Sequence, residues 1–168
     1  MNNQQPTTNN QQQYQGGFTL FIAIIATGTL LLIAAGMANL AVRQDVISTL
    51  SQNSQHAFYA ADAGMECALY WDVKNPDYDW SAFSPSQPSQ SITCNGESTD
   101  VGGSQTSNFE FTLLPDPYCV AVTVSKTNVG STVVTTIESK GYNTCDPLNP
   151  RRVERAVRAT HCIPGPCP

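Results

Sequence analysis

The distribution of hydrophobic and polar residues divides the first part of the chain into segments of different character. Residues 1–17 are polar, low in complexity and rich in Asn and Gln, so they cannot bury enough apolar surface to fold. Residues 18–42 form an uncharged and mostly apolar run of 25 residues. A helix of that length covers about 37 Å, which exceeds the ~30 Å hydrocarbon core of a bilayer. The pattern predicts a polar leader followed by a membrane-spanning helix.

The same helix is expected to continue through residues 43–75, because no proline interrupts residues 18–75. At about 100° per residue, apolar side chains of this segment fall within one arc of the helix surface: Ile47, Leu50, Phe58, Ala61, Met65, Ala68 and Leu69. A second stripe of small residues lies beside this arc: Ala57, Ala60 and Gly64. Small residues at such spacing permit close approach of another backbone. Residues 43–75 are therefore predicted to be amphipathic and to rest one face on a hydrophobic core.

Residues 76–168 are predicted to form a β-rich head that begins with a long loop, residues 76–108, rich in Ser, Gln, Gly and Pro. Four strands follow, predicted from alternating or β-branched residues near 109–113, 119–124, 132–139 and 152–160. Successive strands without intervening helices indicate an antiparallel sheet. The predicted fold class is α+β, with one long N-terminal helix packed on a small antiparallel β-sheet.

Charge changes this picture little, because residues 1–42 carry no charged side chain and the net charge of −5 belongs to residues 43–168. This mild acidity does not favour a nucleic-acid-binding protein. One local exception is a candidate basic patch: Arg151, Arg152, Arg155 and Arg158. These arginines are interpreted either as a DNA-contacting edge or as exposed charges that discourage association of strand edges.

The six cysteines are widely and irregularly spaced: Cys67, Cys94, Cys119, Cys145, Cys162 and Cys167. In an exported chain this spacing favours disulfides over a metal site, and we expect neither a metal nor a cofactor. Six cysteines allow fifteen pairings; Cys67 with Cys94 and Cys145 with Cys162 are two candidates. The chain contains none of the short motifs of hydrolases, metalloproteases or nucleotide-binding enzymes. It is therefore predicted not to be an enzyme.

The start of the apolar run, Gly16-Gly17-Phe18-Thr19-Leu20, resembles the class III signal of type IV pilins and pseudopilins. The resemblance implies a membrane prepilin peptidase that cuts after Gly17 and methylates the new N-terminus at Phe18. It also implies a pilin fold and three further partners: membrane lipid before assembly, an inner-membrane assembly platform and other pilin subunits. The precursor would be a single-pass membrane protein with its head outside the cytoplasm, and the mature subunit would belong to a cell-surface filament. The leader differs from most pilin leaders because it lacks Lys and Arg.

Two further features resemble minor pilins of the PilX type. Major pilins carry Glu at the fifth mature position, which is Ile22 in this chain, and residues 55–69 are similar to a stretch of PilX-type proteins. The resemblance implies a minor subunit that promotes initiation, adhesion or motility of a type IV pilus, or assembly of a secretion pseudopilus. Two alternatives stay open: a DNA-uptake pseudopilin with a basic edge, and an uncleaved signal-anchored surface protein that binds a ligand.

Overall fold

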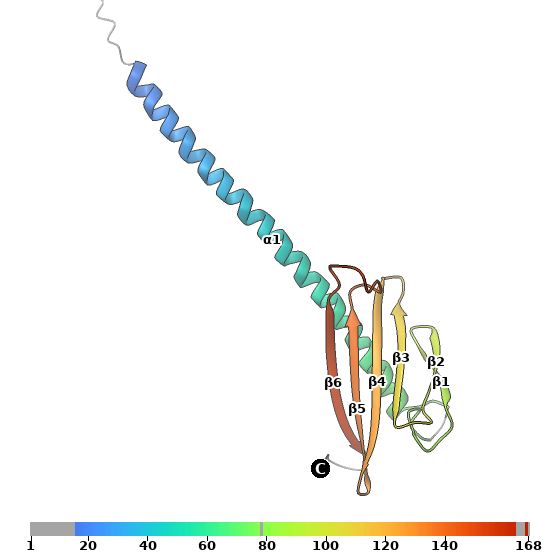
Figure 1. Cartoon of the computed structure of the whole chain (residues 1–168). Helices are drawn as coiled ribbons and strands as arrows, with labels where there is room; N and C mark the ends of the chain where they lie inside the picture. The colour runs from blue at the N-terminus through green and yellow to red at the C-terminus, as the bar shows by residue number, and fades with distance from the viewer. Residues whose placement is uncertain (1–15, 78, 164–166, 168) are drawn as a thin grey trace, which may run out of the picture. The chain divides into compact units, whose positions relative to one another are not determined.

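In the computed structural model, which describes residues 16–77, 79–163 and 167, one long helix precedes six strands (Figure 1). The helix α1 comprises Gly16–Val73. The strands are β1 Gln90–Cys94, β2 Glu97–Val101, β3 Thr106–Leu113, β4 Tyr118–Val129, β5 Thr132–Tyr142 and β6 Glu154–Ile163. The chain divides into two compact units, residues 1–47 and 48–168, and α1 contributes to both. The α+β fold class predicted from the sequence is confirmed.

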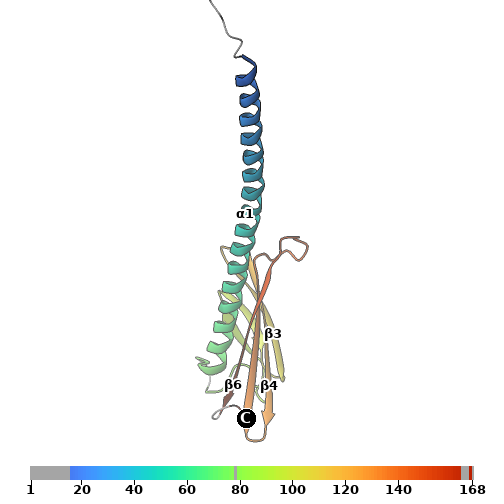
Figure 2. The ribbon, with the colours of Figure 1, turned by 90° about the vertical axis from the view of Figure 1, so that its left-hand side faces the viewer.

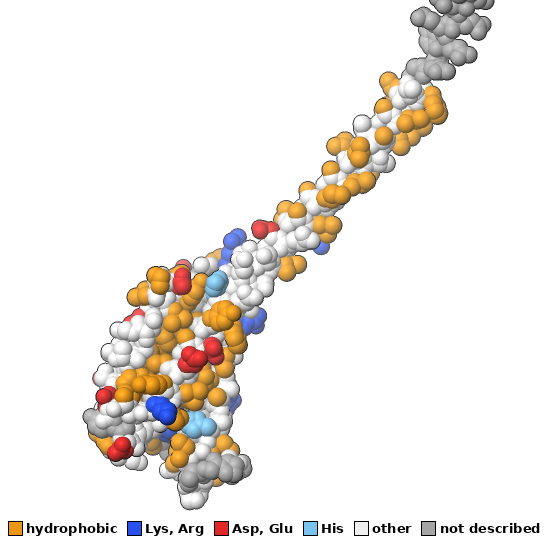
Figure 3. Space-filling model, turned by 180° about the vertical axis from the view of Figure 1, so that it is seen from behind, with side chains coloured by type: hydrophobic (Ala, Val, Ile, Leu, Met, Phe, Trp, Pro, Cys, Tyr) orange, Lys and Arg blue, Asp and Glu red, His pale blue; other side chains and the backbone are white. Residues whose placement is uncertain are grey.

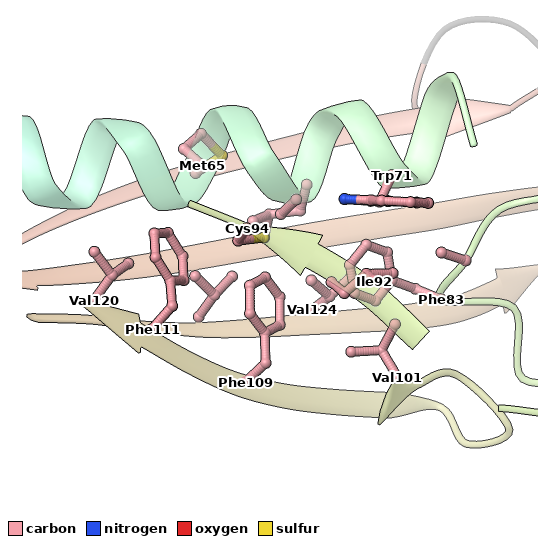
Figure 4. Close-up of a cluster of buried hydrophobic side chains, with 14 of the residues drawn as sticks. Met65, Trp71, Phe83, Ile92, Cys94, Val101, Phe109, Phe111, Val120 and Val124 are labelled. Atoms are coloured by element: carbon pink, nitrogen blue, oxygen red, sulfur yellow. The ribbon is translucent and has the colours of Figure 1, made fainter. Parts of the chain in front are cut away.

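The six strands form two antiparallel sheets within the second unit. Strands β3, β4, β5 and β6 make a meander in that order, and β1 pairs with β2 in a separate hairpin. The residues of α1 from position 48 onward lie along one face of the four-stranded sheet (Figure 2). The hydrophobic core fills the space between this helix segment, the four-stranded sheet and the hairpin (Figure 4). It includes Met65, Trp71, Phe83, Ile92, Phe109, Phe111, Val120, Val122, Val124 and Ile137.

The face that α1 turns toward this core differs from the predicted arc. Ala61, Met65 and Ala68 are buried as expected, but Ile47, Leu50 and Phe58 are exposed. The stripe of small residues is buried in their place: Ala57, Ala60 and Gly64. These residues let α1 approach the sheet so closely that a Cβ added at Gly141 of β5 would lie 2.1 Å from the Ala57 carbonyl oxygen. The predicted apolar arc overlaps the buried face of the helix, but it is rotated toward the larger apolar residues and away from the small residues that are buried.

The predicted loop 76–108 is a second difference, because it contains the β1–β2 hairpin. A two-residue turn joins these strands, and both of its residues, Asn95 and Gly96, have positive φ angles, as the right-handed twist of a hairpin requires. The hairpin is fastened to α1 by the Cys67–Cys94 disulfide and by the Trp71 indole, which donates a hydrogen bond to the Thr93 carbonyl at 3.2 Å. The segment therefore contributes to the core.

The predicted strands of the large sheet are present: β3, β4 and β5 are longer than their patterns indicated, and β6 begins two residues later and ends three residues later than predicted. The disulfide connectivity is Cys67–Cys94, Cys119–Cys145 and Cys162–Cys167. The first of these confirms a predicted pair. The suggested Cys145–Cys162 pair is wrong, because Cys145 lies in the loop after β5 and is bonded to the start of β4, whereas Cys162 is bonded to the C-terminal Cys167.

Candidate functional site

The first candidate site is the apolar segment of α1, residues 18–42. Its large side chains are exposed, including Phe18 at 72%, Leu32 at 75% and Met37 at 64%. Figure 3 shows hydrophobic side chains along the visible face of this segment. Its hydroxyl groups are satisfied inside the helix: Thr27 donates to the Ala23 carbonyl at 2.8 Å, and Thr29 donates to the Ala26 carbonyl at 2.9 Å. Internal pairing of polar groups is what an apolar environment requires.

By length and composition, α1 is the one helix among the described residues that could cross a membrane. None of the residues in the most apolar part of this uncharged stretch is buried within the structure. Ile22, the fifth residue after the predicted cleavage site, is half exposed within this segment. The segment is thus an exposed hydrophobic surface that is long and apolar enough to cross a membrane.

The predicted processing site lies at the very start of the helix. Gly16 and Gly17 are the first residues of α1, and Phe18 follows them. A Cβ placed on Gly17 would meet no atom within 4 Å outside its immediate surroundings, so this junction is sterically open. Residues 1–15 of the predicted leader lie outside the described residues. Cleavage after Gly17 and methylation of Phe18 stay predictions.

The four arginines of the candidate basic patch do not all lie on one face of the sheet. Arg155 lies on the side of β6 that faces α1, where its Nε donates to the Ser54 hydroxyl at 2.8 Å. Arg158 lies on the opposite side of β6 and is paired in register with Glu138 of β5. Arg151 is an exposed residue of the loop before β6. The structure therefore does not bring these charges together into one continuous surface.

The fourth arginine, Arg152, lies over the ring of Tyr142, with its guanidinium carbon 3.8 Å from the ring centroid. Burial, followed by a hydrogen bond to Glu154, raises the pKa of Tyr142 above its ordinary value. This contact is a local cation–π and hydrogen-bonding arrangement at the end of β5. β6 is an edge strand of the four-stranded sheet. These arginines therefore fit the role of charges that protect an open sheet edge from pairing with another strand.

The second candidate site is a cleft of about 570 Å³ at the C-terminal end of α1. It is lined by the last residues of α1, by the connecting segment 79–86, and by residues of β4, β5 and β6. Asp72 and Lys126 lie at its floor and belong to a cluster, called the charge cluster below, whose third member, His161, does not line the cleft and is 25% exposed. The side chain of Asp72 is fully buried and that of Lys126 is 6% exposed.

Asp72 is the centre of this charge cluster. Its Oδ1 lies 2.5 Å from Lys126 Nζ and also accepts a hydrogen bond from the Ser81 hydroxyl. Its Oδ2 lies 2.7 Å from His161 Nε2, although the two atoms are not aligned for a hydrogen bond. Lys126 donates a further hydrogen bond to the Thr135 hydroxyl at 2.9 Å. The charges are thus paired in place, which is the condition for keeping them inside a protein.

The sequence reasoning did not single out this charge cluster. Its three members come from α1, β4 and β6 and are far apart along the chain. The signal available in the sequence was Lys126, which continues the buried alternation of Val120, Val122 and Val124 with a charged residue. A lysine at a position that should face the core implies a buried acidic partner.

Among the described residues, no group of three or more His, Cys, Asp or Glu side chains is arranged to hold a metal ion. All six cysteines are disulfide-bonded. Each disulfide lies within the second unit: the first ties α1 to the hairpin, the second ties β4 to the loop after β5, and the third joins Cys162 of β6 to Cys167. Disulfides of this number are typical of domains exposed to an oxidising compartment.

Comparison with family models, with curated proteins and with solved structures finds no match for this chain. The class of protein therefore follows from the architecture alone. One long N-terminal helix with an apolar first half, packed by its second half on an antiparallel sheet, is a pilin-like architecture. The function of a chain with this architecture goes beyond the fold.

Proposed function

We propose that this chain is a minor pilin of the PilX type, an assembly component of a type IV pilus or of a related secretion filament. The observation that carries the proposal is the continuity of α1. Its apolar residues begin directly after Gly16-Gly17, and the same helix continues without a break into the core of a disulfide-bonded head. A pilin needs this combination, because one helix must anchor the subunit in lipid and later pack among neighbouring helices.

Transfer from membrane to filament requires little net hydrophobic energy, because residues 18–42 exchange lipid for the apolar helices of other subunits. Ile22 is the reason for proposing a minor rather than a major subunit. In a filament core, an N-terminal amine without an acidic partner costs several kcal/mol. A subunit with Ile at this position is therefore suited to a few special positions and poorly suited to the repeating shaft.

The test is the mass and N-terminal sequence of the protein extracted from membranes of its native host, with and without the prepilin peptidase. We expect a chain that begins with methylated Phe18 in the first case and retains residues 1–17 in the second. A Gly17→Val variant should keep its leader, whereas Gly28→Val should be processed normally. Gly28 is a matched control because the space around it is equally open.

A mature chain that begins at another residue would contradict the proposal. If Gly17→Val changes neither the mass nor the location of the protein, the uncleaved signal-anchored alternative is supported instead. The distinction between minor and major subunit is tested separately, by quantifying the protein in sheared filaments. We expect far fewer copies than of the main filament subunit. The DNA-uptake alternative gains little support from the arginines, since Arg155 faces α1 while Arg152 and Arg158 lie on the opposite face of the sheet.

A further inference from the structure

The cleft at the C-terminal end of α1 has the dimensions of a small-ligand site. Its volume of about 570 Å³ lies within the ~300–1,000 Å³ range of clefts that enclose small molecules. The cleft lies wholly within the second unit, because its lining residues belong to positions 72–163. It is also separate from the apolar segment that the proposed filament function uses. A ligand bound there leaves residues 18–42 untouched.

The floor of the cleft is rigid and electrically balanced before any ligand arrives. Asp72 and Lys126 line the cleft, face each other at 2.5 Å and are each more than nine-tenths buried. The pair cannot rotate away easily, since Ser81 holds Asp72 and Thr135 holds Lys126. The Asp72 side chain is fully buried and its Oδ2 faces His161 Nε2 at 2.7 Å, so the carboxylate offers no free oxygen to the cleft. The floor therefore has a fixed shape.

The walls and the rim select against charged and against wholly apolar ligands. The two acidic lining residues, Asp72 and Asp79, are balanced by two basic ones, Lys74 and Lys126. A balanced site creates no field that would favour an anion or a cation. Most other lining side chains are neutral hydrogen-bonding groups: Asn75, Ser81, Ser84, Ser86, Asn128 and Thr135. Such a lining disfavours a lipid chain, because its polar groups would lose water without gaining partners.

An aromatic side chain completes the cleft. Trp80 lines it with 37% of its surface exposed, and its backbone is fixed because Asn75 Nδ2 donates to the Trp80 carbonyl at 2.5 Å. An indole offers a flat apolar surface and a polar N–H, and it suits a ligand with one apolar face and a polar edge. A pyranose ring has this form: its C–H groups cover one face, and its hydroxyls both donate and accept hydrogen bonds.

We propose that the cleft is a binding site for a neutral saccharide of one to two rings. In this arrangement the ring lies against Trp80, and its hydroxyls bind the amide of Asn128 and other neutral polar groups of the lining. The inference goes beyond the proposed filament function and does not depend on it, since the head can bind a sugar whether or not the chain enters a filament. It assigns to the head a recognition role at the end of α1 opposite the apolar residues.

The experiment uses the full-length chain in a zwitterionic detergent, because the headgroups of glucoside and maltoside detergents are themselves saccharides. The protein is first applied to an array of neutral and acidic glycans, and the neutral hits are then titrated by calorimetry. We expect saturable binding of at least one neutral mono- or disaccharide. Trp80→Ala and Asn128→Ala should each weaken this binding by about tenfold, the effect of losing one good contact.

The matched control is Tyr59→Ala, which removes an aromatic side chain that is 66% exposed on α1 and does not line the cleft. We expect unchanged affinity for this variant. Thermal unfolding of all three variants separates loss of binding from loss of folding. The proposal is overturned if no neutral glycan binds, if only acidic glycans or inorganic phosphate bind, or if binding survives both cleft substitutions. None of these outcomes bears on cleavage after Gly17, so the two proposals fail independently.

Discussion

Replacing Gly141 by alanine is the sharpest test of how α1 packs on the sheet. Gly141 lies on β5, on the face that meets α1. An added Cβ would lie 2.1 Å from the Ala57 carbonyl oxygen, 2.2 Å from the Ala61 amide nitrogen and 2.8 Å from the Ala60 carbonyl carbon. All three are backbone atoms of one helix, so no side chain can rotate to relieve the contact. The helix itself must move away by more than about 1 Å to restore ordinary van der Waals separation.

The energetic consequence follows from the size of that displacement. A gap of ~0.5–1 Å already removes a quarter to a half of the dispersion attraction across an interface. The affected interface includes Met65 and Ala68, which lie on the same side of α1. Overpacking in a dense core typically costs ~1–3 kcal/mol, and a contact with rigid backbone belongs at or above the upper end. We therefore expect Gly141→Ala to lower the free energy of unfolding by about 3 kcal/mol or more.

The assay is urea unfolding of the full chain in detergent with its disulfides intact, followed by tryptophan fluorescence. Trp71 is buried in the core and reports its opening. The matched control is Lys140→Ala, the neighbouring residue on β5, whose side chain is 42% exposed and on the other face of the sheet. We expect the control to change stability by less than ~0.5 kcal/mol. A Gly141→Ala protein as stable as the control would show that α1 does not approach β5 this closely.

Two further predictions concern charged and titratable groups of the head. Lys126→Met should destabilise the protein by ~3–5 kcal/mol in the same assay, because it leaves the buried Asp72 carboxylate without its nearest cation. Lys140→Met, which breaks only an exposed 3.6 Å pair with Glu138, should cost less than ~1 kcal/mol; equal effects would contradict the buried pair. The pKa of Tyr142 is raised above 10.0 in the folded protein, so its contribution to stability is complete below that pH and is lost as pH rises through the folded value. The fall in urea midpoint above pH 10.0 should therefore be shallower in Tyr142→Phe, and an unchanged slope would refute the shift.

Most of the fold could be predicted from local residue patterns in the sequence. The alternation at Phe109 and Phe111 and at Val120, Val122 and Val124 correctly predicted which residues of β3 and β4 face the core. Such alternation is reliable because successive side chains of a strand point to opposite faces. The unbroken run from residue 18 to the proline after Asn75 likewise predicted one long helix.

The hairpin was missed because composition was given more weight than local pattern. Residues 81–108 are rich in Ser, Gln and Gly, which is typical of loops, but this segment contains Asn95-Gly96. That dipeptide between short alternating stretches is a strong signal of a two-residue hairpin turn. Ile92 and Cys94, on the inner face of β1, are buried. A search for turn dipeptides within the polar segment would have predicted these two strands.

The charge cluster and the helix rotation could not be predicted from local patterns, because both depend on which elements meet. Asp72, Lys126 and His161 become neighbours only when α1, β4 and β6 are in place. The helix turns its small residues inward because the sheet approaches closely near Gly141, and a larger side chain such as Phe58 has no room there. A hydrophobic arc ranks residues by apolarity, whereas packing selects them by shape as well.

The two halves of α1 also differ in the exposure of their large hydrophobic side chains, and this difference bears on function. Thirteen large hydrophobic side chains between Phe18 and Val42 are exposed. Each releases at least ~1.5 kcal/mol when it leaves water, so together they represent on the order of 20 kcal/mol. That exceeds the ~5–15 kcal/mol net stability of a typical domain, and the head cannot compensate for it. We therefore predict that lipid or neighbouring helices cover this segment, and a full-length chain that stays monomeric and soluble without detergent would refute this prediction.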